Sequence, residues 1–138
     1  MNSSTAAASS AAHTPTNRVK EGVYPTVLVV TEKTSLLETI SYRLDQYHCN
    51  VLEAGNVSNA ICHVITHSRP IHVLLADIAT VDPTGARVLT RYRPTMQVVL
   101  VTMDGHASDA EALGVEAAIA KTRELIHREK AFSAAAGA

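Results

Sequence analysis

The sequence predicts an α/β domain built on a parallel sheet, and three observations lead to this class. Short apolar runs rich in β-branched residues have the length of fully buried strands. Segments whose apolar residues follow the helical period alternate with these runs along the chain. Strict alternation of strands and helices implies a parallel sheet with helices on both faces. Five such units predict a flavodoxin-like, doubly wound domain with strand order 2-1-3-4-5.

The five expected strands are short, and the third ends on an acidic residue. They are Thr26–Val30, Asn50–Ala54, Ile71–Asp77, Val98–Val101 and Ala117–Ala120. In an open parallel sheet, ligands bind outside the carboxyl ends of the strands. Asp77, Thr102 and Lys121 each end or directly follow an apolar run, so we expect a carboxylate, a hydroxyl and an ammonium at one edge. Glu32 follows the first strand, beside the predicted switch point between strands 1 and 3.

Helices are expected after each strand, and most have a recognisable start or end. The first begins at Thr34 or Ser35 and runs to about Gln46, with Leu36, Leu37, Ile40 and Leu44 on its apolar face. The second is capped by Ser58, buries Ile61, Val64 and Ile65, and stops before Pro70. A loop with Pro83 and Gly85 precedes a short third helix that holds Val88 and Leu89 and ends near Pro94. Ser108 and Glu111 resemble a capping box for a short fourth helix closed by Gly114, and Arg123–Phe132 is the fifth.

The length of 138 residues indicates one domain with a sizeable core. Residues 1–22 carry few large apolar side chains and are expected to form a disordered tail. The domain spans 23–132, and residues 133–138 are a short C-terminal tail. Cys49 and Cys62 have neither metal-ligand spacing nor a CxxC arrangement, which favours two reduced thiols in an intracellular protein.

Charge and hydropathy argue against two classes of partner. The 12 Lys and Arg residues nearly balance the 13 Asp and Glu residues, without the basic stripe that nucleic-acid binding needs. No apolar run reaches the roughly 20 residues that span a bilayer, and the N-terminus lacks the apolar core of a secretory signal. We therefore expect no nucleic acid, no membrane, and a cytoplasmic location.

The ordered set of strand ends resembles the receiver domains of two-component response regulators over about Thr26 to Phe132. Val27–Glu32 resembles the first strand with its acidic pair, and Leu74–Ile78 resembles the strand that carries the phosphoacceptor. Gly85 stands where receivers commonly have the glycine of an Asp-Gly turn. Thr102 matches the switch hydroxyl after strand 4, and Lys121 matches the lysine after strand 5.

The resemblance implies a phosphorelay function in signal transduction rather than an enzyme. A histidine kinase, a phosphotransfer protein or a small phosphodonor would transfer a phosphoryl group to Asp77, with self-catalysed transfer and dephosphorylation at most. Mg²⁺ would be held by Glu32, Asp77 and the backbone carbonyl of Ala79, since Mg²⁺ takes oxygen ligands. Lys121 would offset phosphoryl charge and Thr102 would donate a hydrogen bond. A stand-alone receiver would act through a downstream protein target, and a homodimer is left open.

Four positions depart from the receiver pattern. Thr31 replaces the first of two acids, which weakens the expected metal site, and Met103 replaces a small residue beside Thr102. Ala118 occupies the position of the aromatic switch residue, and Thr122 replaces a proline. The alternative hypothesis is therefore a pseudo-receiver, an interaction module that works without phosphorylation. A small flavodoxin-like enzyme or nucleotide binder is the third class, but the sequence has no glycine-rich phosphate loop.

Each site residue also has a structural interpretation. Thr102 and Lys121 would be ordinary residues outside the set, and Glu32 could simply favour a helix N-terminus. His63 and His67 have the i, i+4 spacing that could clamp a transition metal, but no third ligand is evident in the sequence. We interpret them as structural, together with His48 and His72.

Overall fold

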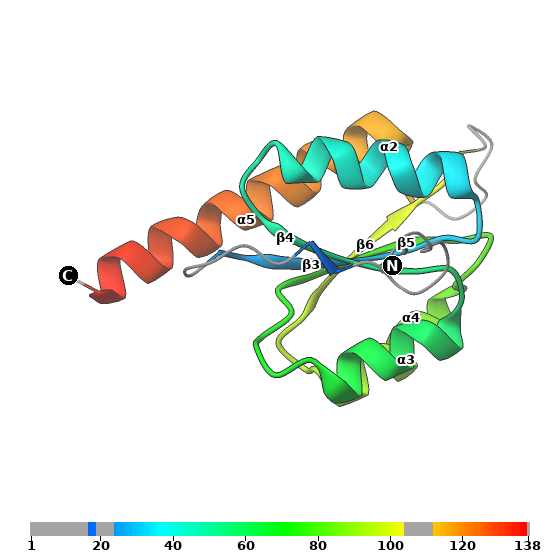
Figure 1. Cartoon of the computed structure of the whole chain (residues 1–138), viewed down its shortest axis with the longest axis horizontal. Helices are drawn as coiled ribbons and strands as arrows, with labels where there is room; N and C mark the ends of the chain where they lie inside the picture. Colours follow the sequence, from blue (N-terminus) through cyan, green and yellow to red (C-terminus); the bar gives the residue numbers. More distant parts are fainter. Residues whose placement is uncertain (1–16, 19–23, 104–111, 138) are drawn as a thin grey trace, which may run out of the picture.

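The computed structural model describes residues 17–18, 24–103 and 112–137, with side chains described for 24–103 and 112–128. A five-stranded sheet in the order β2-β4-β3-β5-β6 separates two layers of helices, α2 with α5 on one face and α3 with α4 on the other (Figure 1). The strands are β2 (Asn17–Arg18), β3 (Thr26–Val30), β4 (Asn50–Ala54), β5 (Val73–Asp77) and β6 (Gln97–Val101). The helices are α2 (Thr34–Asp45), α3 (Val57–Thr66), α4 (Pro83–Tyr92) and α5 (Val115–Gly137).

The four strands from β3 to β6 are parallel, which confirms the order 2-1-3-4 predicted for the first four strands. All residues of β3 and β5 are buried. Near-continuous apolar strands of this kind are typical of parallel sheets that are covered on both faces. The prediction of an α/β sheet with helices on both sides is therefore confirmed.

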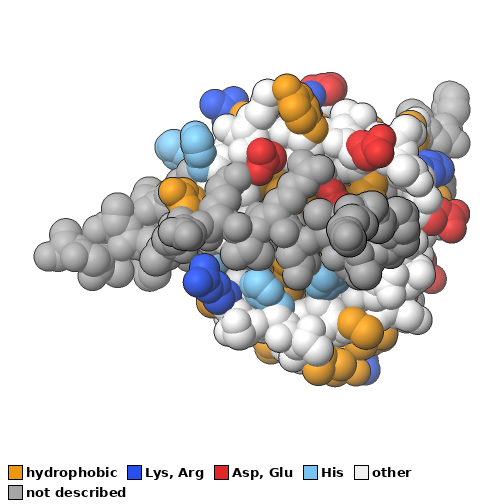
Figure 2. Space-filling model, viewed as in Figure 1, with side chains coloured by type: hydrophobic (Ala, Val, Ile, Leu, Met, Phe, Trp, Pro, Cys, Tyr) orange, Lys and Arg blue, Asp and Glu red, His pale blue; other side chains and the backbone are white. Residues whose placement is uncertain are grey.

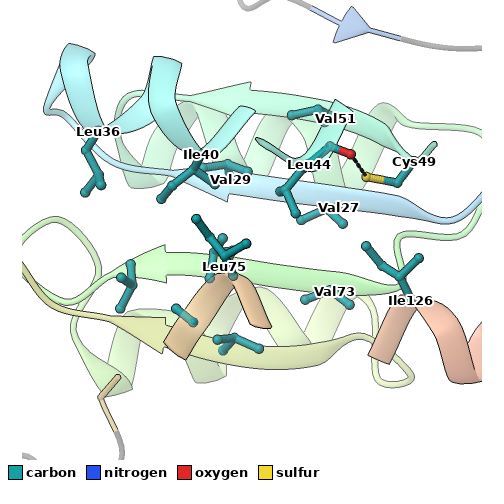
Figure 3. Close-up of a cluster of buried hydrophobic side chains, with 14 residues drawn as sticks. Val27, Val29, Leu36, Ile40, Leu44, Cys49, Val51, Val73, Leu75 and Ile126 are labelled. Atoms are coloured by element: carbon teal, nitrogen blue, oxygen red, sulfur yellow. Dashed lines mark hydrogen bonds between the residues drawn. The ribbon is translucent and has the colours of Figure 1, made fainter. Parts of the chain in front are cut away.

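The core has two halves, one on each face of the sheet. Figure 3 shows the half under α2 and α5, where Leu36, Ile40 and Leu44 of α2 point toward the sheet, as the helical spacing predicted. The buried Cys49 thiol donates to the carbonyl oxygen of Leu44, 3.0 Å away, and this bond ties the end of α2 to the chain entering β4. Cys49 and Cys62 are not joined by a disulfide, as expected.

The starts of α3 and α4 differ from the expectation. Asn56, not Ser58, caps α3, and its side chain accepts from the Asn59 N–H at 2.8 Å. The prediction of a loop containing Pro83 and Gly85 is wrong, because α4 begins at Pro83. The Asp82 side chain accepts from the Gly85 N–H at 2.7 Å, so an acidic cap and a proline at the first position start the helix together.

The prediction of a fifth parallel strand is wrong. Ala117–Ala120 lies in the first turns of α5, so the predicted helix Arg123–Phe132 begins at Val115 instead. A single residue, Leu113, continues the sheet beyond β6: its N–H donates to the Leu100 carbonyl and its carbonyl accepts from the Thr102 N–H. The sheet therefore keeps four of the five expected parallel strands.

The composition of this segment explains the helix. Alanine has the highest helix propensity and contributes little side chain to a buried strand. The buried positions Ala118, Ile119, Thr122 and Ile126 follow the helical spacing i, i+1, i+4 and i+8. Glu124 pairs with Lys121 at 3.3 Å and with Arg128 at 3.5 Å across successive turns.

Both ends of the chain carry structure where tails were expected. Asn17 and Arg18 form β2, which pairs antiparallel with Val51 and Leu52 of β4. At the other end, α5 continues to Gly137. The expected fourth helix at Ser108–Glu111 lies outside the described residues. None of the described helices is long and apolar enough to cross a membrane.

The replacement Ala120→Val tests the helical assignment, because valine is unfavourable in a helix and favourable in a strand. Ala120 is exposed, so packing contributes little to the result. We expect the free energy of unfolding in urea to fall by about 0.5 kcal/mol. Ala120→Leu, which keeps a good helix former, is the matched control and should change stability less. A more stable valine variant would show that this segment is a strand.

Candidate functional site

Asp77 is the last residue of β5 and lies at the carboxyl edge of the sheet, as predicted. Its side chain is buried, with 1% exposure. Oδ2 accepts from the Thr31 hydroxyl at 2.8 Å, and Oδ1 accepts from the Ala79 N–H at 3.0 Å. Both carboxylate oxygens therefore have a donor within the chain, which offsets the cost of burying the group.

Thr31 lies opposite Asp77 because of the strand register. Val30 of β3 is level with Ala76 of β5, so the next residue on each strand is also level. Thr31 is as buried as Asp77, at 1% exposure. The sequence marked Thr31 only as a missing acid and did not reveal it as the donor to Asp77. One feature of the sequence could have indicated the pairing: Thr31 directly follows the first predicted strand, which lies next to the strand that ends at Asp77.

Two further hydrogen bonds join the loops around Asp77. The Thr31 hydroxyl oxygen accepts from the Lys33 N–H at 3.1 Å, at the start of α2. The Glu32 N–H donates to the Thr80 hydroxyl oxygen at 3.0 Å, which connects the loop after β3 to the loop after β5. Thr80 was not singled out in the sequence, because a hydroxyl three residues past a strand has no distinctive pattern.

Thr102 is close to the predicted place. Val101 is level with Asp77 in the sheet, so Thr102 lies one residue further toward the edge. Its side chain is largely buried, and its N–H donates to the Leu113 carbonyl at 2.7 Å. Met103, which replaces the small residue that receivers have beside Thr102, has an exposed side chain.

Among the described residues, no contact joins Lys121 to Asp77. It lies in α5, and its exposed ammonium is 3.3 Å from Glu124. The predicted meeting of Asp77, Thr102 and Lys121 depended on a fifth parallel strand, which the structure replaces with a helix. Ala118, expected at the aromatic switch position, is buried in α5 under the sheet. The structure therefore joins Asp77 to Thr31 and leaves Lys121 apart.

The residues predicted to hold Mg²⁺ carry oxygen donors, which are the type of ligand that a hard cation prefers. Glu32 and Asp77 offer carboxylates and Ala79 offers a carbonyl, which are donors that Mg²⁺ accepts. Thr31 contributes a neutral hydroxyl where a second acid would add charge, and it already occupies Oδ2. In the described part of the chain, no group of three or more His, Cys, Asp or Glu side chains is placed to hold a metal. The described residues therefore offer oxygen donors of the right chemistry but no preformed metal site.

His63 and His67 do not form a metal clamp. The His63 ring Nε2 lies 3.0 Å from the Glu53 carbonyl oxygen and is turned toward the sheet. Beside His67, the Arg93 guanidinium donates to the carbonyl oxygens of Val64, His67 and Arg69, and so closes the end of α3. Burial, with the positive charge of Arg93 and neighbouring His63 and Arg69, lowers the pKa of His67 from its usual 6.5.

Two cavities lie away from Asp77. One of about 520 Å³ lies between α2 and α5, where Arg43, Tyr47 and Arg123 contribute to its lining. Arg43 pairs there with Glu116 at 3.0 Å, and the Arg123 guanidinium lies 4.9 Å from the centre of the Tyr47 ring. The second, of about 250 Å³, lies near the amino ends of β5 and β6. On the face shown in Figure 2, acidic and basic side chains of the described residues are interspersed.

The fold is similar to solved receiver domains. A response regulator receiver domain from Clostridium thermocellum matches with a TM-score of 0.62 and 18% identity, over 78% of this chain and 98% of that one. A CheY-like receiver domain from Methanospirillum hungatei matches with a TM-score of 0.60 and 19% identity, over 78% and 98%. A response regulator from Burkholderia pseudomallei with a phosphorylated aspartic acid, calcium ion and citrate has a TM-score of 0.51 and 14% identity, over 70% and 54%.

The sequence itself matches no family model and no curated protein. At sequence identities this low, the similarity to the solved structures is a similarity of fold alone. The chain therefore has the α/β architecture of receiver domains, with one parallel strand fewer than predicted.

Replacing Thr31 with valine tests the bond to Asp77. The variant keeps the shape of the side chain but leaves Oδ2 buried without its donor, which costs about 1–3 kcal/mol. We expect urea unfolding to show a loss in this range, with a smaller loss for Thr31→Ser. Thr34→Val makes the same substitution at an exposed position and should stay within about 0.5 kcal/mol of the wild type. Equal losses at both positions would argue against the bond.

The lowered pKa of His67 predicts a pH dependence of stability. The folded protein binds a proton at His67 at lower pH than the unfolded chain does, so stability is full above the unfolded pKa of about 6.5 and falls as the pH drops through it. We expect His67→Gln to reduce this loss when unfolding free energies at pH 8 and pH 5.5 (about 1.5 units above and 1 unit below the reference) are compared. An unchanged pH dependence would contradict the environment described for His67.

Proposed function

We propose that the protein is an atypical receiver that accepts a phosphoryl group on Asp77 in a phosphorelay and signals through a partner protein. The observation that supports this most directly is the position of Asp77, a buried carboxylate at the end of the third parallel strand of a receiver-like fold. The similar protein from Burkholderia pseudomallei has a phosphorylated aspartic acid and a calcium ion. A carboxylate in this fold is therefore chemically suited to the proposed reaction.

In the proposed reaction, one Asp77 oxygen attacks the phosphorus atom of the donor. A P–O bond forms, the bond to the donor's leaving group breaks, and the leaving group keeps the electron pair. The donor would be a histidine kinase, a phosphotransfer protein or a small phosphodonor. The protein would be a substrate of the relay, with at most self-catalysed transfer and dephosphorylation, rather than an enzyme with its own product.

The cation that supports phosphoryl transfer would be Mg²⁺, which neutralises developing charge on the phosphoryl oxygens. Glu32, Asp77 and the Ala79 carbonyl would hold it. Because Thr31 supplies no charge, we propose that binding is weak and that transfer is slow. Thr102 lies at the same edge and would donate to a phosphoryl oxygen. Lys121 would reach the site only after a rearrangement of α5.

One observation favours the second candidate, a pseudo-receiver that binds a partner without phosphorylation. Asp77 has almost no exposure, and both its oxygens are already hydrogen-bonded within the chain. A phosphoryl donor can therefore reach Asp77 only when the loops around Asp77 open. If the loops do not open, the fold would serve only as an interaction module.

Incubation with acetyl phosphate and millimolar Mg²⁺, followed by intact-mass measurement, separates the two candidates. We expect the mass to rise by one phosphoryl group, and we expect Asp77→Asn to abolish the change because the amide is not a nucleophile. Asp82→Asn is the matched control: Asp82 is exposed, and asparagine also caps a helix well. An unmodified wild type would favour the pseudo-receiver, and a modified Asp77→Asn variant would show that the acceptor is wrong.

A further inference from the structure

We propose that Thr31 is a positioning residue that couples the state of the Asp77 carboxylate to the start of α2, a role that builds on the proposed phosphoacceptor. The Thr31 hydroxyl has two partners at once. It donates to Asp77 Oδ2 at 2.8 Å and accepts from the Lys33 N–H at 3.1 Å. One side-chain oxygen therefore joins the candidate reactive group to the residue that precedes α2.

Phosphorylation of Asp77 would change the acceptor in this chain of bonds. A carboxylate oxygen accepts a charge-assisted hydrogen bond, which is about twice as strong as a neutral one. In an acyl phosphate, one of the two carboxyl oxygens bridges to phosphorus and the other becomes a neutral carbonyl. Whichever oxygen reacts, Oδ2 becomes a poorer acceptor for Thr31. The hydroxyl is then free to rotate toward another acceptor, because its hydrogen follows the best partner.

The start of α2 is well placed to respond. Lys33 is the N-cap of α2, and no side chain caps the helix there. The hydroxyl of Thr31 holds the Lys33 N–H, and the Lys33 carbonyl accepts from the Leu37 N–H in the first turn. A change at Thr31 therefore acts directly on the N-cap of α2, which no side chain caps.

The far end of this helix contacts α5. Arg43 of α2 pairs with Glu116 of α5 through two bonds, at 3.0 and 3.2 Å, beside the cavity between the two helices. A shift of α2 would alter this pairing and the exposed surface around it. The position expected to hold an aromatic switch residue is occupied by the buried Ala118. The geometry thus assigns the response to Asp77 to the α2 side of the molecule.

A double-mutant cycle tests the coupling without any phosphodonor. The readout is the amide proton shift and hydrogen-exchange rate of Lys33 in wild type, Asp77→Asn, Thr31→Val and the double variant. We expect Asp77→Asn to shift the Lys33 amide and to speed its exchange roughly fivefold. The same substitution should have no such effect in the Thr31→Val background. Thr31→Ser, which restores the hydroxyl, should restore the response, whereas a purely structural role of Thr31 would not produce this pattern.

The outcomes separate this proposal from the proposed function. If Asp77→Asn leaves Lys33 unchanged, or shifts it equally in both Thr31 backgrounds, the coupling is overturned. A second arm adds beryllofluoride and Mg²⁺ to the wild type and to Thr31→Val. A failure of beryllofluoride to perturb Asp77 counts against the phosphoacceptor, while the cycle still decides the coupling. Binding at Asp77 with no response at Lys33 would overturn the coupling and leave the phosphoacceptor standing.

Discussion

The parallel pairing of β3 with β5 sets both the packing of the core and the geometry around Asp77. Both strands are buried along their whole length, and their apolar residues alternate between the two core halves. Val27 and Val29 face α2 and α5, while Leu28 and Val30 face α3 and α4. A slip of one residue would reverse these faces, which makes the register strongly specified. The same register places Thr31 level with Asp77, so the packing of the core determines the geometry of the site.

Asp77 illustrates how a buried acid is retained. A carboxylate without partners is costly in an apolar interior, but two donors at 2.8 and 3.0 Å satisfy its oxygens here. A neutral hydroxyl from Thr31 avoids the repulsion that a second carboxylate would bring to the same place. The consequence for function is a trade-off. Both oxygens of Asp77 are satisfied without a cation, and under the proposed function the neutral hydroxyl would make Mg²⁺ bind more weakly.

The edge of the sheet at β6 shows the consequence of finding a helix, α5, where a fifth strand was expected. In the described part of the chain, the outer edge of β6 is bridged at Leu113, and Val98 is 39% exposed. Open strand edges favour pairing with other chains, and proteins usually protect them. Here α5 crosses the face of β5 and β6 and buries Ile119 and Ile126. The helix thus replaces the core contacts of a strand, while Leu113 is the described residue that bridges the outer edge of β6.

Sequence patterns were sufficient to predict the parallel sheet of β3 to β6, the apolar face of α2 and the place of Asp77 and Thr102 at the carboxyl edge. These features follow from local signals, because burial on both faces requires continuous apolar strands and the helical period is visible within two or three turns. The alanine-rich stretch before Lys121 was ambiguous, because short apolar runs suit either a strand or a helix. Its packing against the sheet, as part of α5, is what makes it helical. Tertiary structure alone also paired Thr31 with Asp77. Residues 46 positions apart meet only when the register of two strands is set, and no local pattern contains that information.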